Sequence, residues 1–187
     1  MTGLSGSGKS TIARALEEEL VKKHGKHVQQ LDGDNVRTGL NRDLGFSPDD
    51  RAESVRRVGE MACLFNGGGV ITLVTLVSPY REDREEARRR HEEQGLPFLE
   101  VYMHVPIEVV QARDPKGLYA KVAAGEITSF TGMSADAPYE EPLAAEVGLS
   151  RLVRLTVTPG EHSFVRTNNR LTCATISFRS RSACRCS

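Results

Sequence analysis

A glycine-rich segment near the start of the chain has the residue types and spacing of a phosphate-binding loop. Residues 3–10 read Gly-Leu-Ser-Gly-Ser-Gly-Lys-Ser, which fits the pattern G-x-x-x-x-G-K-[ST] in full. Glycines allow backbone angles at which several N–H groups point at one anion. Lys9 can reach the β- and γ-phosphates of a nucleotide, and the hydroxyl of Ser10 can ligate Mg²⁺. The segment therefore predicts binding of a nucleoside triphosphate.

Two carboxylates follow at a distance that suits the same site. Asp32 and Asp34 lie in the run Asp-Gly-Asp-Asn at 32–35, directly after the short candidate strand 28–31. In open α/β sheets, ligands bind at the carboxyl ends of the strands. We expect Asp34 to hold Mg²⁺ through water or to accept the proton of an acceptor hydroxyl. A polar turn with a capping aspartate is the structural alternative.

The elements that must position these groups alternate between helix and strand. Residues 10–23 have apolar side chains at helical spacing, and residues 47–67 open with the helix-starting run Ser-Pro-Asp-Asp. The remaining predicted elements are strands at 28–31, 70–77 and 98–105, and helices at 81–94, 107–112 and 118–124. This order predicts an α/β fold with a mostly parallel central sheet flanked by helices.

A phosphate loop normally follows a buried strand, but only Met1 and Thr2 precede Gly3. We therefore expect the first strand of the fold to be missing and the sequence to be truncated at its N-terminus. Four buried apolar residues in such a strand would contribute roughly 6–12 kcal/mol, which is comparable with the stability of a whole domain, about 5–15 kcal/mol.

The last part of the chain differs in charge from the rest. Residues 148–187 contain seven Arg, no Lys and one acidic residue, Glu161, so that a net charge of zero divides into +6 there and −6 elsewhere. We expect one domain at 1–147 and a basic tail at 148–187. A frameshift or unspliced intron in the gene model is one hypothesis for this tail, and a basic arm that binds anions is the other.

The composition of the chain indicates its cellular compartment and excludes some classes of partner. The four cysteines form no Cys-x-x-Cys pair, so the sequence gives little support for a zinc site. We expect the cysteines to be reduced, as in a reducing compartment. The sequence has no run of about 18 apolar residues, and its start lacks the basic and apolar regions of a signal peptide. We expect a cytoplasmic protein, or a plastid protein if a transit peptide has been lost. Neither a membrane nor a nucleic acid is an expected partner.

Beyond the loop, a series of short strings identifies a family. These strings are TGLSGSGKST at 2–11, LDGDNVR at 31–37, LN at 40–41, LGFSP at 44–48, DR at 50–51, VRR at 55–57, SPY at 78–80, DR at 83–84, AR at 87–88, RD at 113–114, KGLY at 116–119, GEI at 125–127, FTG at 130–132 and YE at 139–140. With them the chain resembles the adenylyl-sulfate kinase (adenosine 5′-phosphosulfate kinase) family over residues 2 to about 147. The resemblance implies a P-loop kinase fold and phosphorylation of the ribose 3′-hydroxyl of adenosine 5′-phosphosulfate by ATP, with Mg²⁺.

The resemblance also implies roles for matched positions. Lys9 and Asp34 would be catalytic, and Ser10 and Asp34 would hold the metal. The ATP site would comprise Gly6, Ser7, Gly8, Lys9, Ser10, Thr11 and Arg113. The acceptor pocket would comprise Asp34, Asn35, Val36, Arg37, Phe46, Arg51, Ser54, Val77, Ser78, Lys116, Ser129 and Phe130.

Several of these residue types suit the implied acceptor. Arg37 and Arg51 offer guanidinium forks for a phosphosulfate, and Phe46 and Phe130 offer flat faces for a purine. Ser54 stands where the family commonly has Asn, which weakens a polar contact.

Two other functions remain open from the sequence. The chain could be another small-molecule P-loop kinase, for example one that acts on a sugar acid. It could instead be a non-catalytic nucleotide-binding remnant, or a fragment of a larger sulfurylase–kinase fusion. A homodimer and a sulfurylase, as a partner or as a fused domain, are the protein partners that the resemblance implies.

Overall fold

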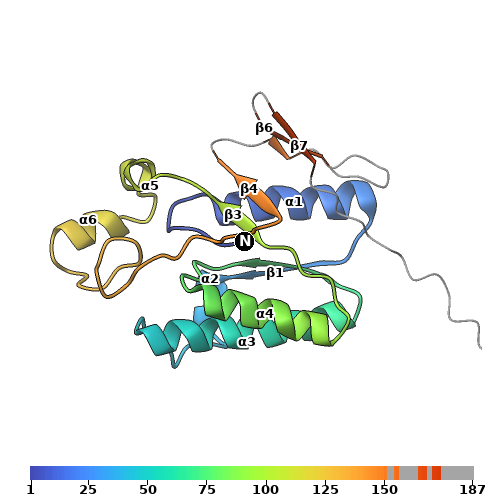
Figure 1. Ribbon diagram of the computed structural model, residues 1–187, viewed down its shortest axis with the longest axis horizontal. Coiled ribbons are helices and arrows are strands. Elements are labelled where there is room, and N and C mark those ends of the chain that lie inside the picture. The colour runs from blue at the N-terminus through green and yellow to red at the C-terminus, as the bar shows by residue number, and fades with distance from the viewer. Residues whose placement is uncertain (151–153, 156–163, 168–169, 174–187) are drawn as a thin grey trace, which may run out of the picture. The chain divides into compact units, whose positions relative to one another are not determined.

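The computed structural model describes residues 1–150, 154–155, 164–167 and 170–173 (Figure 1). The chain divides into two compact units, Met1–Arg151 and Leu152–Ser187. Within the second unit, the described strands β5 (Arg154–Leu155), β6 (Phe164–Thr167) and β7 (Arg170–Cys173) pair antiparallel. Most of the predicted tail at 148–187 lies outside the described residues, and the domain boundary at 147 stays a prediction.

The first unit alternates between helices and strands, as the sequence predicts. In chain order its elements are α1 (Lys9–His24), β1 (Val28–Asp32), α2 (Gly33–Arg37), α3 (Pro48–Gly67), β2 (Ile71–Thr75), α4 (Arg81–Glu93), β3 (Val101–Met103), α5 (Ile107–Arg113), α6 (Leu118–Ala123) and β4 (Val147–Leu149). Two of them differ from expectation. The polar run at 32–35, expected as a turn, begins the short helix α2, because Asp32 and Asn35 make a capping box. The strand β4 was not predicted.

The strands of this unit pair in parallel. β1 and β2 lie in register from Val28 opposite Ile71 to Asp32 opposite Thr75, and β3 pairs with β4. This register brings the carboxyl ends of β1 and β2 to the same edge of the sheet, where parallel α/β sheets bind ligands.

The first two residues lie between the two strand pairs. Thr2 forms a parallel bridge with Tyr102, in which Thr2 N donates to Val101 O at 2.8 Å and Met103 N donates to Thr2 O at 2.9 Å. On the other side, the Met1 ammonium donates to Val74 O at 2.7 Å. The strand that normally precedes a phosphate loop is thus represented in the structure by an isolated bridge.

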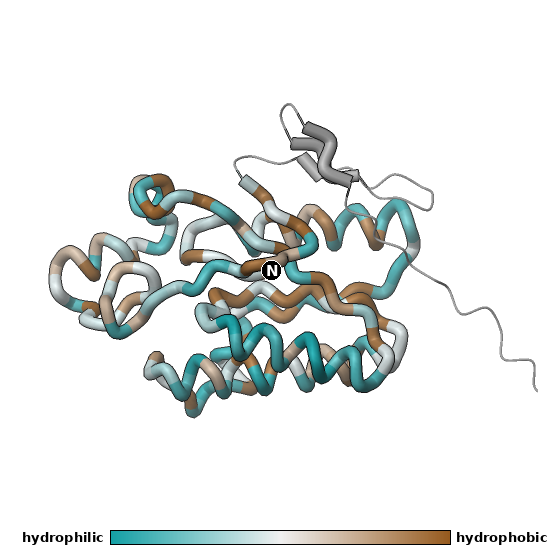
Figure 2. The backbone as a smooth tube through the Cα atoms, viewed as in Figure 1, coloured by the Kyte–Doolittle hydropathy of each residue, from teal (hydrophilic) through white to brown (hydrophobic). Residues whose placement is uncertain are grey.

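Helices cover both faces of the sheet. Figure 1 shows α1 on one side of the strands and α3 with α4 on the other. Leu31 of β1 packs with Val36 of α2 and with Val55 and Val58 of α3 in a buried apolar cluster. In Figure 2 much of β2, β3 and β4 is brown and α4 is largely teal, as expected for buried strands and for a helix whose outer face meets water.

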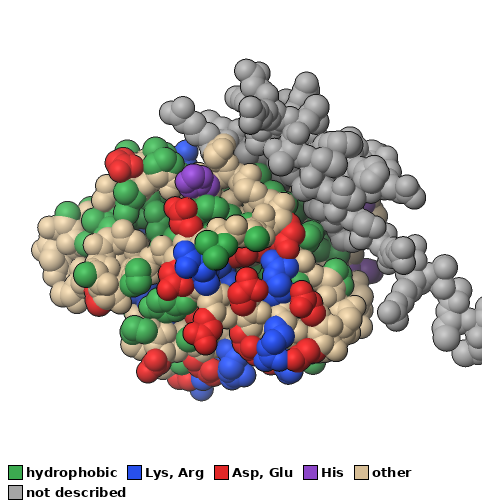
Figure 3. All heavy atoms as spheres, viewed as in Figure 1, with side chains coloured by type: hydrophobic (Ala, Val, Ile, Leu, Met, Phe, Trp, Pro, Cys, Tyr) green, Lys and Arg blue, Asp and Glu red, His purple; other side chains and the backbone are tan. Residues whose placement is uncertain are grey.

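The outward faces of α3 and α4 carry interspersed charges of both signs (Figure 3). Arg90 of α4 pairs with Glu60 of α3 at 2.9 Å, and Arg56 pairs with Glu53 at 2.6 Å within α3. Such exposed pairs are worth about 0–1 kcal/mol each, so the apolar cluster beneath them carries most of the stability of this layer.

Replacing Leu31 by Ala should lower the free energy of unfolding by about 2–5 kcal/mol, because Leu31 is 5% exposed and its removal leaves a cavity between β1 and α3. Leu64→Ala is the matched control, since Leu64 is 79% exposed and should change stability by less than about 0.5 kcal/mol. Urea unfolding of both variants checks this. Equal losses of stability would contradict the assignment of the core.

Candidate active site

The phosphate loop runs from Gly3 to the start of α1. Gly8 is the residue before the helix and has φ of 97°, and no side chain among the described residues caps the helix. The first N–H groups of α1 therefore face outward with the positive end of the helix dipole, which favours an anion. Gly3 must also be glycine, because a Cβ there would lie 2.9 Å from the Cβ of Met103.

Lys9 lies within this loop. Its ammonium donates to the carbonyl oxygens of Gly3 and Leu4, at 2.8 Å each, and its side chain is largely buried. Burial, with a smaller contribution from the positive charge of Lys116, lowers the pKa of Lys9 to about 8. A bound phosphate would have to draw the ammonium away from these two carbonyls.

Asp32 joins the loop to the sheet. Its Oδ2 accepts hydrogen bonds from Ser10 Oγ at 2.5 Å and from Thr75 Oγ1 at 2.7 Å, and its Oδ1 accepts from Asp34 N at 2.9 Å. Burial alone would raise the pKa of Asp32, but these hydrogen bonds outweigh it and hold the pKa below its usual range. The assignment of a metal to Ser10 and Asp34 stays a prediction. In the structure, the carboxylate that meets Ser10 is that of Asp32, the last residue of β1.

Asp34 faces a different partner. Its exposed carboxylate forms an ion pair with Lys116, which follows α5 in the chain. The segment that carries Lys116 also approaches the phosphate loop, because a Cβ on Gly6 would lie 3.5 Å from Cδ of the neighbouring Pro115. The structure therefore brings the predicted residues Asp34 and Lys116 together beside the phosphate loop.

A second group of predicted residues gathers around Phe46, whose ring is 62% exposed. The guanidinium of Arg37 lies over this ring at 4.3 Å from its centroid, and its Nη1 donates to Gly45 O at 3.2 Å. Arg51 Nε donates to Phe46 O at 2.8 Å. Burial and the neighbouring charge of Arg51 lower the pKa of Arg37. Two guanidinium groups beside one exposed aromatic ring suit a ligand that has both an anionic group and a planar ring.

Residues 77 and 78 form a tight corner after β2. Ser78 has φ of 40°, in the left-handed region that costs a non-glycine residue about 1–3 kcal/mol. Predicted residue Phe130 lies half-buried, with its ring edge-on to Tyr119 at 5.0 Å between centroids.

Three predicted acceptor residues have structural partners. Ser54 is buried, and its hydroxyl accepts a hydrogen bond from Asn41 Nδ2 at 2.8 Å. The side chain of Val36 lies in the apolar cluster, so only its backbone can face a ligand. Asn35 Oδ1 accepts from the backbone N–H of Asp32 at 3.1 Å and caps α2.

The remaining predicted residues lie at the loop or farther along the chain. Ser7 is buried within the loop, and Thr11 is exposed on the first turn of α1. Arg113 is exposed at the end of α5, and Ser129 is half-buried just before Phe130.

Other features of the described residues lie away from this site. A hollow of about 750 Å³ lies between α3 and α4, and its charged lining residues include the ion-paired Glu60 and Arg90. Among the described residues, no group of three or more His, Cys, Asp or Glu side chains could hold a metal. No helix in that part of the chain is both long and apolar enough to cross a membrane.

Comparison with curated proteins gives close relatives. The chain is 54% identical to the adenylyl-sulfate kinase of Penicillium chrysogenum over 153 residues, which covers 79% of this chain and 72% of that protein. It is 56% identical to adenylyl-sulfate kinase 1, chloroplastic, of Arabidopsis thaliana over 151 residues, covering 81% of this chain and 53% of that protein.

Solved structures of APS kinases also match this chain. The Mycobacterium tuberculosis APS kinase in complex with AMPPNP and APS matches with a TM-score of 0.77 and 48% identity, covering 80% of this chain and 85% of that one. A hexameric APS kinase from Thiobacillus denitrificans matches with a TM-score of 0.55 and 34% identity, covering 79% of this chain and 24% of that one. The family model for adenylylsulphate kinase matches residues 1–150. The chain belongs to the adenylylsulphate kinase family.

Proposed function

We propose that this chain transfers the γ-phosphoryl group of ATP to the ribose 3′-hydroxyl of adenosine 5′-phosphosulfate, and releases ADP and 3′-phosphoadenosine 5′-phosphosulfate. The observation that carries the proposal is the meeting of the phosphate loop with Asp32 and Asp34 at one edge of the sheet, in a chain of this family. The similar kinase from Mycobacterium tuberculosis, in complex with AMPPNP and APS, supports the choice of both substrates.

The residues beside the phosphate loop would carry out the transfer step. The 3′-oxygen attacks the γ-phosphorus, the bond from that phosphorus to the β,γ-bridging oxygen breaks, and ADP leaves with the bonding electrons. Asp34 takes the proton of the hydroxyl, which its exposed carboxylate can do once Lys116 turns to the phosphates. Because the transition state is loose, Lys9 and Lys116 contribute by neutralising charge and by positioning.

The donor set beside the loop fits Mg²⁺. Ser10 Oγ and Asp32 Oδ2 lie 2.5 Å apart and both are hard oxygen donors. Mg²⁺ in phosphoryl-transfer enzymes takes one or two protein oxygens and completes its shell with phosphates and water, so a larger cluster of carboxylates is not needed. When bound, the ion neutralises charge on the β- and γ-phosphates. We assign Asp32 to it, beside the predicted Ser10 and Asp34.

The group around Phe46 is assigned to the acceptor. Arg37 and Arg51 would bind the phosphosulfate, and Phe46 would stack on the adenine. Ser78 and Phe130 would complete the pocket. A homodimer and a sulfurylase partner remain predictions from the family resemblance, and a cytoplasmic location remains a prediction from composition.

The purified chain should form 3′-phosphoadenosine 5′-phosphosulfate from Mg-ATP and adenosine 5′-phosphosulfate, and Lys9→Ala should reduce kcat by about 10²–10³ or more. The loss follows from removing the ammonium that lies within the loop. Chromatographic separation of the two nucleotides measures the product. A wild-type chain that binds ADP but forms no product would contradict the assignment, and gluconate as an acceptor tests the sugar-acid alternative.

Asp32→Asn should raise the Mg²⁺ concentration needed for half-maximal rate by about tenfold or more, because the amide keeps the shape but loses the negative charge beside Ser10. Titration of the rate with Mg²⁺ at saturating ATP measures it. The matched control is Asp43→Asn, since Asp43 is an exposed carboxylate that pairs with Arg57. An unchanged Mg²⁺ dependence in Asp32→Asn would remove Asp32 from the metal site.

The rate and the stability should change in opposite directions above pH 8. The free enzyme loses the Lys9 charge as pH rises through its pKa of about 8, so kcat/KM for ATP should fall. Between that value and the unfolded pKa of about 10.4, the unfolded state binds more protons at Lys9, so the free energy of unfolding should rise with pH. Initial rates and urea unfolding from pH 7 to 10 measure both. Lys9→Met should abolish the rise in stability above pH 8, since the rise below pH 8 also includes the buried ammonium of Met1, whose pKa is lowered to about 5. A kcat/KM that is flat to pH 9.5 would contradict the prediction.

A further inference from the structure

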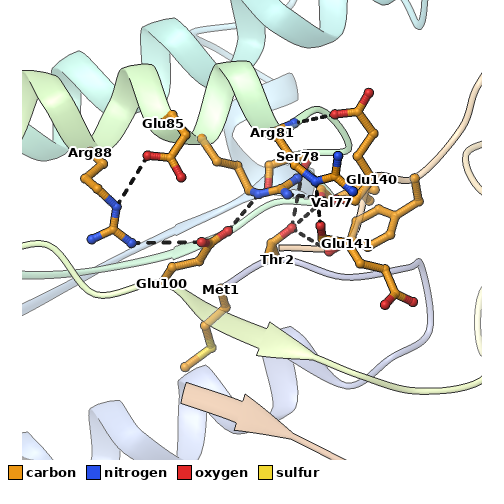
Figure 4. A network of polar contacts seen from close by, with 12 residues as sticks. Met1, Thr2, Val77, Ser78, Arg81, Glu85, Arg88, Glu100, Glu140 and Glu141 are labelled. Carbon is orange, nitrogen blue, oxygen red and sulfur yellow. Dashed lines mark hydrogen bonds and ion pairs between the residues drawn. The ribbon is translucent and has the colours of Figure 1, made fainter. Parts of the chain in front are cut away.

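The corner between β2 and α4 is held by hydrogen bonds to its carbonyl groups. Ser78 O accepts from Arg84 Nη1 at 2.7 Å and from Thr2 Oγ1 at 3.3 Å. Val77 O accepts from Thr2 Oγ1 at 2.8 Å. Figure 4 shows Thr2, Val77 and Ser78 gathered close to Glu140. A serine at φ of 40° keeps that conformation only where its surroundings restrain it, and these hydrogen bonds are such restraints.

Arg84 reaches three partners at once from the first turns of α4. Besides Ser78 O, its Nη2 donates to Glu140 O at 2.7 Å, and its Nε lies 2.7 Å from Glu100 Oε1. This last contact is an ion pair and not a hydrogen bond, because Glu100 Oε1 accepts no hydrogen bond from the described residues. The side chains of Arg84 and Glu100 are only 7% and 9% exposed.

Glu100 is itself fixed by a second arginine. Arg88, one turn farther along α4, makes a two-pronged contact with Glu146 at 2.7 and 3.0 Å and lies 3.9 Å from Glu100 Oε2. Glu146 Oε2 accepts from Glu100 N at 2.6 Å. Figure 4 shows Arg88 directed at Glu100, away from Ser78. Arg88 therefore belongs to the same network, and its contacts with Glu100 and Glu146 lie away from the corner.

The chemistry of the network requires arginine at position 84. The planar guanidinium presents its donors in fixed directions, so one group can hold the carbonyls of Ser78 and Glu140 and still face Glu100. A lysine ammonium is a point charge on a flexible stem and cannot hold all three. A buried charge is costly unless it is paired, and Glu100 supplies that partner.

We propose that Arg84, oriented by Glu100, is a positioning residue for the acceptor pocket, because it holds the carbonyl of Ser78 and with it the strained backbone of that residue. Arg84 acts through Ser78 and touches neither substrate. The proposal rests on the proposed function, in which Val77 and Ser78 line the site of adenosine 5′-phosphosulfate.

Arg84→Lys keeps the charge and should raise KM for adenosine 5′-phosphosulfate by about tenfold, with KM for ATP changed by less than about twofold. Arg89→Lys is the matched control, since Arg89 is an exposed arginine of α4 that pairs with Glu86 outside this network, and it should leave both KM values within about twofold. A role confined to folding would instead lower the thermal midpoint without separating the two KM values, and that result would overturn the proposal. Glu100→Gln should change the acceptor KM in the same direction and serves where Arg84→Lys does not fold.

The strain itself provides a second test. Glycine adopts positive φ without strain, so Ser78→Gly lessens the need for the restraint. In the Ser78→Gly background, the effect of Arg84→Lys on the acceptor KM should shrink to about threefold or less. An undiminished tenfold effect would mean that Arg84 does not act through the conformation of Ser78.

A measurement without turnover separates this proposal from the proposed function. Amide hydrogen exchange of the segment 75–80 should be faster in Arg84→Lys than in the wild type, and unchanged in Arg89→Lys. Equal exchange in all three would overturn the positioning role, whether or not the wild type is active. Faster exchange with no wild-type product would keep the structural role of Arg84 and overturn the function assigned to the pocket.

Discussion

The carboxylate of Asp32 is the point on which the site depends. It accepts one hydrogen bond from the helix that follows the phosphate loop, through Ser10, and another from the neighbouring strand, through Thr75. A third comes from the backbone of Asp34, in the first turn of α2. These contacts require the parallel register that sets Asp32 opposite Thr75. If β1 shifted by one residue, this carboxylate would turn to the other face of the sheet and the loop would lose its link to both strands.

The charged residues of the site are already engaged with the protein. Lys9 is held by backbone carbonyls, Lys116 is paired with Asp34, and Arg37 lies over an aromatic ring. Each substrate group must therefore replace a contact of similar kind, so the net gain in binding is smaller than the gross interaction. Discrimination between substrates then depends on how many of these exchanges one molecule can make together.

Local patterns predicted much of this structure. The glycine spacing predicted the loop with Lys9 and Ser10, and capping residues and apolar spacing predicted most helices and strands. The sequence did not predict which of two nearby aspartates meets Ser10, because that depends on where β1 ends and on how α2 is capped. The restraint on Ser78 could not be predicted either. It comes from Thr2, which is far away in the sequence, and from Arg84, and arginines are common on exposed helices.

The contacts of Thr2 also order the events of folding. Thr2 bonds to the backbone of Val101 and Met103 and to the hydroxyl of Tyr139, which is 137 residues away in the sequence. During synthesis the phosphate loop leaves the ribosome long before these partners exist, and contacts so distant in sequence form slowly because a large loop must close. Helices α1 and α3 can form from local interactions alone. The nucleotide site is thus made of early residues but becomes a site only late, when nearly all of the first unit has emerged.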